Sequence, residues 1–217
     1  MPRVGVVLSG CGVKDGSEIH EATLTLFFLD RAGAETICMA PNMNQVEVIN
    51  HLTNKSMDEK RNVLVESARI ARGNIEDMKQ VKAGDLDALI FPGGLGAASS
   101  LSSFATKGAG CTVIPEVERL IREMHEARKP MGFICIAPVI AAKVIRGVQL
   151  TIGNDKDTAS AIERMGGKHI VRNVDEIAVD EQNRVVSAPA YMLGPTISKV
   201  ALGIEKLVAK VLELARK

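Results

Sequence analysis

The sequence predicts an α/β fold in which a mostly parallel sheet is covered by helices on both faces. Short apolar runs rich in β-branched residues alternate with stretches of helical period, and the loops between them are short. The chain has 217 residues, 46% hydrophobic and 24% charged, which is the composition of a globular domain with a sizeable core. Because no shift in composition marks a boundary, we expect residues 1–217 to form one domain.

Several expected strands end at a residue that breaks strands. Residues 3–9 (RVGVVLS) run into Gly10, and residues 35–40 (ETICMA) stop at Pro41. The remaining strands of the sheet are expected at 88–91, 130–135 and 150–152.

The expected helices carry an apolar stripe with helical spacing. In residues 18–32 this stripe consists of Ala22, Leu26 and Leu29, and Gly33 follows the last turn. The other helices are expected at 113–127, 138–145, 157–165 and 195–215.

Three segments interrupt this alternation. Near the C-terminus a polar four-residue segment separates residues 176–179 from residues 184–187, which predicts a small β-hairpin. Residues 42–62 form a polar insert with a candidate strand at 45–49, and residues 99–112 show no clear period. We expect the last two segments to be loops near an edge of the sheet.

The charge balance and composition exclude several classes of function. Lys and Arg number 27 and Asp and Glu number 26, and the net charge is +1. We expect no nucleic-acid partner, because such a partner needs a concentrated positive field. No apolar run reaches the roughly 18 residues that cross a bilayer, so we expect no membrane partner.

The cysteines are scattered and have no CxxC spacing. This pattern predicts neither a disulfide scaffold nor a zinc site, and nothing in the sequence calls for a metal or another cofactor. The N-terminus passes directly into a strand-like run without a targeting segment, so we expect a reducing, cytoplasmic location. The four residues are Cys11, Cys38, Cys111 and Cys135.

The unusual residues of the chain follow three of the expected strands. They occupy residues 9–21, residues 92–96 and residues 132–138. Because the carboxyl ends of parallel strands meet at one edge of an open sheet, where ligands bind, we expect these segments to form a site.

Cys135 is the candidate nucleophile of this site. It lies where a buried strand turns into a helix, and the positive end of that helix is expected to lower the pKa of the thiol. Gly93 and Gly94 permit backbone amides to face the sulfur, and the amide of Ile136 is the second candidate oxyanion donor. The alternatives are a buried, inert cysteine and a plain tight turn.

Two carboxylates at the start of the first helix are candidate proton carriers. Glu18 and Glu21 are three residues apart and share a face, so one of them can meet the thiol. A carboxyl that is partly desolvated there would have a raised pKa and could move protons. The alternative is that both acids belong to an N-terminal cap built on Ser17. His20 lies off that face, and we expect it to be exposed.

Several sequence blocks together indicate a family. LSGCGVKDGSEIHEA at 8–22, DALIFPGGLGAA at 87–98, PMGFICIAP at 130–138 and SAPAYML at 187–193 resemble the PfpI superfamily of class I glutamine amidotransferase-like proteins, and in particular its ElbB glyoxalase-like branch. The resemblance implies a flavodoxin-like fold, the elbow cysteine at Cys135 and the acid of the first helix at Glu21. It also allows a homodimer.

The resemblance departs from the family pattern at one place. A histidine often follows the strand after the cysteine, and here that place reads Thr151-Ile152-Gly153-Asn154. Proton transfer is therefore expected from Glu21, with Glu18, His20 and Asn154 as supporting candidates.

The function predicted by the resemblance is a glyoxalase that needs neither glutathione nor a cofactor. The substrate is a small aldehyde, glyoxal or methylglyoxal, and the product is a 2-hydroxy acid formed through a hemithioacetal on Cys135. Gly93, Gly94 and Ile136 would hold the oxyanion. The alternatives are a non-enzymatic stress protein with Cys135 as a redox sensor, and amide hydrolysis or transfer.

Overall fold

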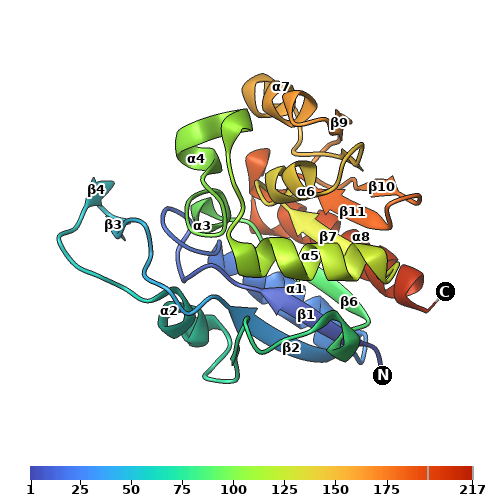
Figure 1. The fold of residues 1–217 in the computed structure, drawn as a ribbon, viewed down its shortest axis with the longest axis horizontal. Coiled ribbons are helices and arrows are strands. Elements are labelled where there is room, and N and C mark those ends of the chain that lie inside the picture. The colour runs from blue at the N-terminus through green and yellow to red at the C-terminus, as the bar shows by residue number, and fades with distance from the viewer. Residues whose placement is uncertain (195, 217) are drawn as a thin grey trace.

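A seven-stranded sheet forms the centre of the protein in the computed structural model, which describes residues 1–194 and 196–216 (Figure 1). The strand order is β10-β11-β7-β6-β1-β2-β5, and all neighbours are parallel except β10 and β11. The strands are β1 (Arg3–Val7), β2 (Glu35–Ala40), β5 (Glu76–Asp77), β6 (Ala88–Phe91), β7 (Met131–Ile134), β10 (Ala178–Asp180) and β11 (Val185–Ala188).

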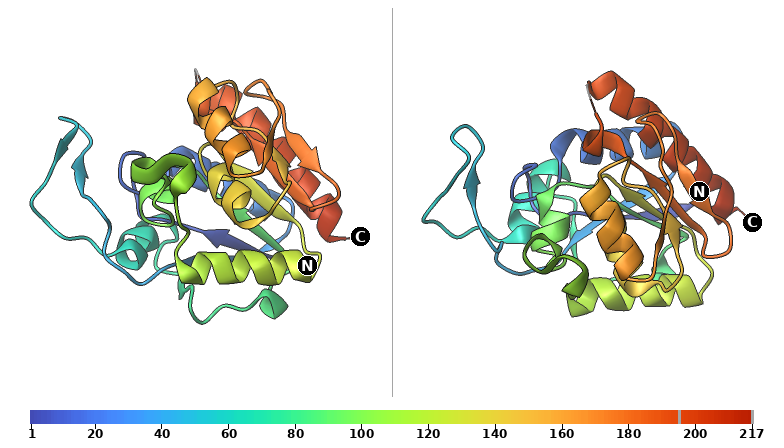
Figure 2. Two further views of the ribbon diagram at one scale, coloured as in Figure 1. Left: turned by 45° about the horizontal axis from the view of Figure 1, so that its top comes forward. Right: turned by 90° about the horizontal axis from the view of Figure 1, so that it is seen from above.

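Helices cover both faces of the sheet (Figure 2). α1 (Ile19–Arg31) and α8 (Ile197–Ala215) lie on one face, and α5 (Pro115–Glu126) and α6 (Pro138–Val144) lie on the other. The remaining helices are α2 (Val63–Ile70), α3 (Leu95–Ser99), α4 (Phe104–Lys107) and α7 (Lys156–Arg164), and short 3-10 turns are η1 (Ala83–Asp85), η2 (Gly108–Gly110) and η3 (Ala190–Met192).

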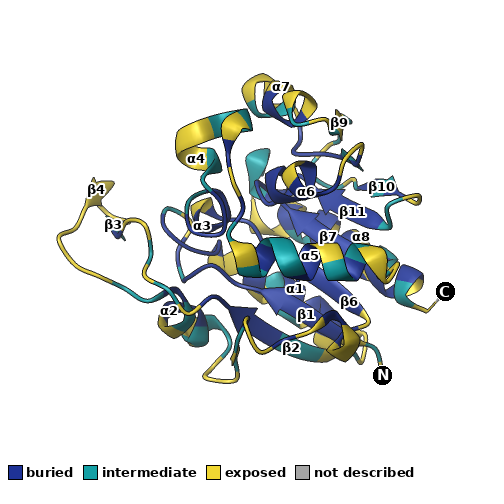
Figure 3. Cartoon of the chain, viewed as in Figure 1, coloured by how far each residue is buried: buried dark blue, intermediate teal, exposed yellow. Residues whose placement is uncertain are grey.

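The core lies between the sheet and the two helical layers (Figure 3). Every residue of β6, β7 and β11 is buried, as expected for parallel strands covered on both faces. Phe91 and Phe133 stack on neighbouring strands with ring centroids 4.9 Å apart. A side chain on Gly132 would lie 2.9 Å from Leu207, so this glycine lets α8 pack closely against β7.

The fold class predicted from the sequence is confirmed, and most of its elements are present. β2 and β6 begin and end where the sequence predicts, at 35–40 and 88–91, and the predicted hairpin is formed by β10 and β11. The expected helix at 195–215 is α8, which begins at Ile197 with Thr196 as its N-cap; residue 195 lies outside the described residues.

Two expected strands were wrong in place or partner. The segment at 150–152 is not a strand of the central sheet, because β8 (Gln149–Leu150) pairs with β9 (Lys168–His169) in a separate two-stranded sheet. In the polar insert the strand is not at 45–49: β3 (Ile49–Asn50) pairs with β4 (Lys55–Ser56) in a hairpin that projects from the body (Figure 1).

The physical reason for both errors is a side-chain bond to the backbone. The amide of Gln149 donates to the Asp180 carboxylate (2.7 Å), so β8 is held to β10 through a side chain and does not pair with it. The side-chain amide of Gln45 donates to the carbonyl of Asp15 (2.9 Å), so Gln45 anchors the base of the projecting arm, residues 42–62, instead of starting a strand. The sequence prediction also missed α2, and treated the segment that holds α4 as a loop.

Candidate active site

The three segments expected to form a site meet at one edge of the sheet. They follow β1, β6 and β7, which are neighbours in the sheet. After β1 the chain adds β2 and β5 on one side of it and then β6 and β7 on the other, so the strand order changes direction between β1 and β6. A side chain added to Gly93 would lie 2.4 Å from the Cys135 Cβ and 2.6 Å from Glu21 Oε2. Glu21, Gly93 and Cys135 are therefore in direct contact, at the position where open α/β sheets bind ligands.

Cys135 occupies a strained turn between β7 and α6. Its φ is +61°, a left-handed conformation that costs a residue with a side chain about 1–2 kcal/mol. Its amide donates to the carbonyl of Ala188 on β11 (2.9 Å), which fixes the end of β7. A residue held in a strained strand-to-helix turn has the geometry of the nucleophile elbow of α/β enzymes.

Two backbone amides face the thiol. The backbone amides of Gly94 and Ile136 both act to lower the pKa of the Cys135 thiol, as N–H donors close to a sulfur do. Gly94 has a φ of +98°, and a side chain on it would lie 2.3 Å from the amide nitrogen of Glu18, so only glycine fits. These amides are the donors expected from the sequence, and they can bind an oxygen that becomes negatively charged beside the sulfur.

Glu21 is completely buried next to the thiol. Its Oε2 accepts a hydrogen bond from the amide of Gly93 (2.9 Å), and its Oε1 accepts one from the amide of Tyr191 (3.1 Å). Its carboxyl also lies beside Cys135, since a side chain added to Gly93 would touch both residues. Burial raises the pKa of Glu21 to about 8, and the nearby Glu18 acts in the same direction. This carboxyl can therefore carry a proton near neutral pH.

The expectation that the helix N-terminus lowers the pKa of Cys135 was wrong. Burial, and next the charge of Glu21, raise the pKa of the Cys135 thiol well above its usual value, although the amides of Gly94 and Ile136 act to lower it. The residue is only 7% exposed, so desolvation outweighs the two amides. Because the thiol of Cys135 and the carboxyl of Glu21 interact, the two groups titrate as a pair, and the first pKa describes the pair and not either group alone.

Glu18 has a structural task. It is the N-cap of α1, and its Oε2 accepts a hydrogen bond from the amide of Glu21 (2.7 Å). The alternative interpretation placed the cap at Ser17, but the Ser17 hydroxyl instead accepts a hydrogen bond from the amide of Ser9 (2.8 Å), shortly after β1. Glu18 thus holds the first turn that carries Glu21.

The remaining candidates lie at the rim. His20 is exposed, as expected, and its Nδ1 lies 2.8 Å from the Tyr191 hydroxyl. Asn154 is also exposed, and within residues 1–194 and 196–216 its side chain has no hydrogen-bond partner. The structure therefore connects His20 to the site and does not connect Asn154 to it.

Tyr191 is a site residue that the sequence reasoning missed. It contacts Glu21 through its amide and His20 through its hydroxyl. The preceding Ala190 is buried and has a φ of +44°. An alanine in a sequence does not predict such a left-handed turn, which usually contains glycine. The only available signal was the position of this tyrosine in the SAPAYML block, and it is the single tyrosine of the chain.

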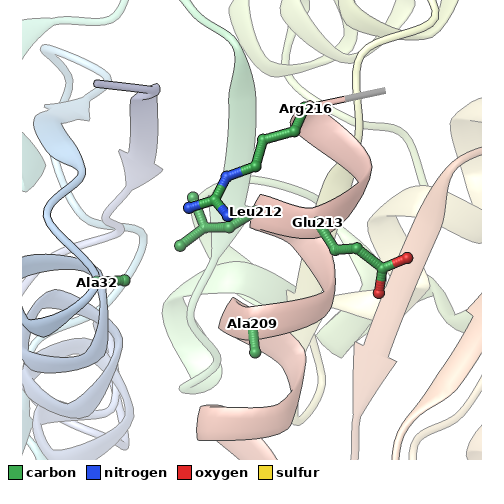
Figure 4. A pocket seen from close by; sticks show the side chains of 5 residues that line it. All are labelled: Ala32, Ala209, Leu212, Glu213 and Arg216. Carbon is green, nitrogen blue, oxygen red and sulfur yellow. The ribbon is translucent and has the colours of Figure 1, made fainter.

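The surface elsewhere carries a pocket that is remote from this chemistry. A pocket of about 430 Å³ lies between the end of α1 and the last turns of α8, where Ala32 faces Leu212 and Arg216 (Figure 4). Ala32 is eleven residues beyond Glu21, which is about 16 Å along a helix.

Among the described residues, no cluster of three or more His, Cys, Asp or Glu side chains could hold a metal ion. None of the described helices is long and apolar enough to cross a membrane.

Comparison with known proteins identifies the family, although no family model matches the chain. A rat protein named ES1 protein homolog, mitochondrial, is 50% identical, and the match covers 99% of this chain and 85% of the relative. The human glutamine amidotransferase-like class 1 domain-containing protein 3, mitochondrial, is also 50% identical, with 99% and 84% covered. The chain belongs to the class I glutamine amidotransferase-like family.

Solved structures agree with this family. The crystal structure of an isoprenoid biosynthesis protein with an amidotransferase-like domain from Ehrlichia chaffeensis matches with a TM-score of 0.91 and 37% identity, covering 97% of this chain and 99% of that one. DJ-1beta of Drosophila melanogaster matches with a TM-score of 0.56 and 19% identity, covering 99% and 96%, which shows the shared fold alone.

The names of the relatives correct one prediction. Both mammalian proteins are named mitochondrial, and so is the ES1 protein of Danio rerio, which is 37% identical. This finding contradicts the cytoplasmic location expected from the sequence. That expectation rested partly on free, scattered cysteines, which indicate a reducing environment and not one particular compartment.

Proposed function

We propose that this protein is a glyoxalase-type enzyme that needs neither glutathione nor a cofactor, and that it belongs to the ElbB-like glyoxalase branch of its superfamily. Its substrate is a small 2-oxoaldehyde such as glyoxal or methylglyoxal. One observation carries the proposal: Cys135 sits in a left-handed elbow, with the Glu21 carboxyl on one side and the amides of Gly94 and Ile136 on another.

The reaction begins with addition of the thiol to the aldehyde. The pair of Cys135 and Glu21 loses one proton, and the sulfur then adds to the aldehyde carbon to form a hemithioacetal. The aldehyde oxygen takes the negative charge, and the amides of Gly94 and Ile136 stabilise it before it is protonated. One such donor typically contributes about 3 kcal/mol to the transition state.

Glu21 then moves a hydrogen between the two carbons. Its carboxylate removes the proton from the former aldehyde carbon, and the electron pair gives an enediol. Returning a proton to the neighbouring carbon produces a thioester of the 2-hydroxy acid on Cys135. Water hydrolyses this thioester, which frees the thiol and releases lactate from methylglyoxal. The aldehyde carbon is oxidised while the ketone carbon is reduced, so no external oxidant is needed.

The proposal is tested by following lactate in a mixture of purified protein and methylglyoxal without glutathione. Wild type and Cys11→Ala are expected to form lactate, since Cys11 is a half-exposed thiol in the neighbouring loop and serves as the matched control. Cys135→Ala and Glu21→Gln are expected to form almost none. Absence of lactate with the wild type, or equal rates with Cys135→Ala, rejects the proposal.

The redox-sensor alternative is less well supported by the same site. Peroxide reacts with thiolates that are exposed, whereas burial and the Glu21 charge raise the pKa of the Cys135 thiol well above its usual value. Cys11 is more exposed than Cys135. Mass spectrometry after mild peroxide distinguishes the two readings: a sensor requires Cys135 to be oxidised ahead of the other three cysteines.

A further inference from the structure

The turn that follows β11 contacts α1 at two consecutive residues, His20 and Glu21. The amide of Tyr191 donates to Glu21 Oε1 (3.1 Å), and the hydroxyl of the same tyrosine lies 2.8 Å from His20 Nδ1. The two rings are 5.8 Å apart. The side chains of neighbouring helical residues such as His20 and Glu21 point about 100° apart. Because Tyr191 contacts His20 with its ring and Glu21 with its backbone, these two contacts together fix its orientation.

This turn is strained where it meets the site. Ala190 is fully buried and has a φ of +44°, a conformation that persists only when surrounding contacts hold it. The turn is closed by the amide of Met192 on the Pro189 carbonyl (3.0 Å) and by that of Leu193 on the Ala190 carbonyl (3.1 Å). Neither bond reaches α1, so the contacts of Tyr191 are the ones that attach the strained turn to Glu21.

We propose that the hydrogen bond between His20 and Tyr191 is a latch that positions the Glu21 carboxyl for proton transfer, an inference that rests on the function proposed above. Tyr191 is thus a positioning residue that acts through Glu21. Releasing the ring lets the strained turn relax and moves the Tyr191 amide away from the carboxyl.

The groups around Glu21 indicate what the latch changes. Its carboxyl is faced by Glu18 from α1, by Cys135 from the elbow, by the Gly93 amide after β6 and by the Tyr191 amide from η3. Of the contacts that lower the pKa of Glu21, the Tyr191 amide has the largest effect. Weakening that bond should shift the ionisation of the pair to higher pH.

The test uses Tyr191→Phe, which removes only the hydroxyl, and His20→Ala. Each is expected to reduce kcat/KM for methylglyoxal roughly threefold to tenfold, about the effect of losing one hydrogen bond. The double variant should lose no more than either single variant, because both remove the same contact. His20→Gln, which can still bond to the hydroxyl, should restore much of the rate. Thr23→Ala, at an exposed position of the same helix, is the control.

A second measurement does not depend on turnover. The protonation of Glu21 is followed against pH by the infrared C=O band of a protonated carboxyl, assigned by its absence in Glu21→Gln, and Tyr191→Phe and His20→Ala should move its midpoint upward by roughly 0.5–1 pH unit. An unchanged midpoint overturns the latch even if activity falls, since a merely structural defect would lower activity alone. If the wild type makes no lactate, the proposed function fails, and the infrared titration of Glu21 still decides whether the latch exists.

Discussion

Replacing Glu21 by glutamine tests how strongly the site opposes ionisation. Folding raises the pKa of Glu21 from its ordinary 4.5 to about 8 because the carboxyl is buried. Below pH 4.5 both folded and unfolded chains hold this proton, and above pH 8 neither does. Between these values only the unfolded chain ionises, so stability falls as pH rises. A rise of about 3.5 in pKa corresponds to a loss of about 5 kcal/mol across this window.

Glutamine cannot ionise, so Glu21→Gln should lack this part of the pH dependence. At pH 5 the variant should be less stable than the wild type by about 1–3 kcal/mol, because both carboxyl oxygens accept backbone amides and an NH₂ group leaves one donor unpaired. Between pH 5 and pH 8 the difference should shrink and then reverse in favour of the variant.

The assay is urea unfolding followed by circular dichroism at intervals from pH 4 to pH 9. The difference in unfolding free energy between wild type and Glu21→Gln isolates this one group from the many others that titrate. Glu47→Gln, at an exposed position, should retain the wild-type slope. Parallel curves for wild type and Glu21→Gln from pH 4.5 to pH 8 would refute the reasoning.

Three glycine and alanine positions give further predictions. Gly93→Ala places a methyl group 2.4 Å from the Cys135 Cβ, so lactate formation should fall by more than about 100-fold and melting temperature should drop, whereas Gly84→Ala, with no atom within 4 Å, should change neither. Ala190→Gly relieves a left-handed alanine, so the unfolding free energy should rise by about 0.5–1 kcal/mol in urea titration; a decrease would contradict the assigned strain. Gly203→Ala puts a methyl group 2.4 Å from the Val174 carbonyl, and the same titration should show a loss of about 1–3 kcal/mol; no loss would argue against this packing of α8.

The parts of the fold that follow from periodicity were predictable from sequence. The strands at 35–40 and 88–91 are rich in apolar residues and each stops at a proline, so their bounds could be stated directly. The errors arose where one side chain binds a distant backbone group. The Asp180 carboxylate places β8 outside the sheet, and Gln45 anchors the projecting arm. Hydrophobic pattern carries no information about such bonds.

The site was predictable in part for a similar reason. Parallel strand ends share one edge, so Cys135 and the glycine pair could be brought together by topology, and the family resemblance selected Glu21. The pKa of the thiol could not be predicted, because its direction depends on the balance between burial and two amides. Tyr191 was missed because its role depends on the left-handed turn at Ala190.

The most direct test of the catalytic role of Cys135 is mass spectrometry of the protein quenched in acid during reaction with methylglyoxal. The peptide that contains Cys135 should carry one added methylglyoxal mass, and this adduct should disappear as lactate forms. Cys135→Ala should show neither adduct nor lactate, and Cys11→Ala should behave as the wild type. An adduct confined to Cys11, or lactate formation that persists in Cys135→Ala, would contradict the assignment of Cys135 as the nucleophile.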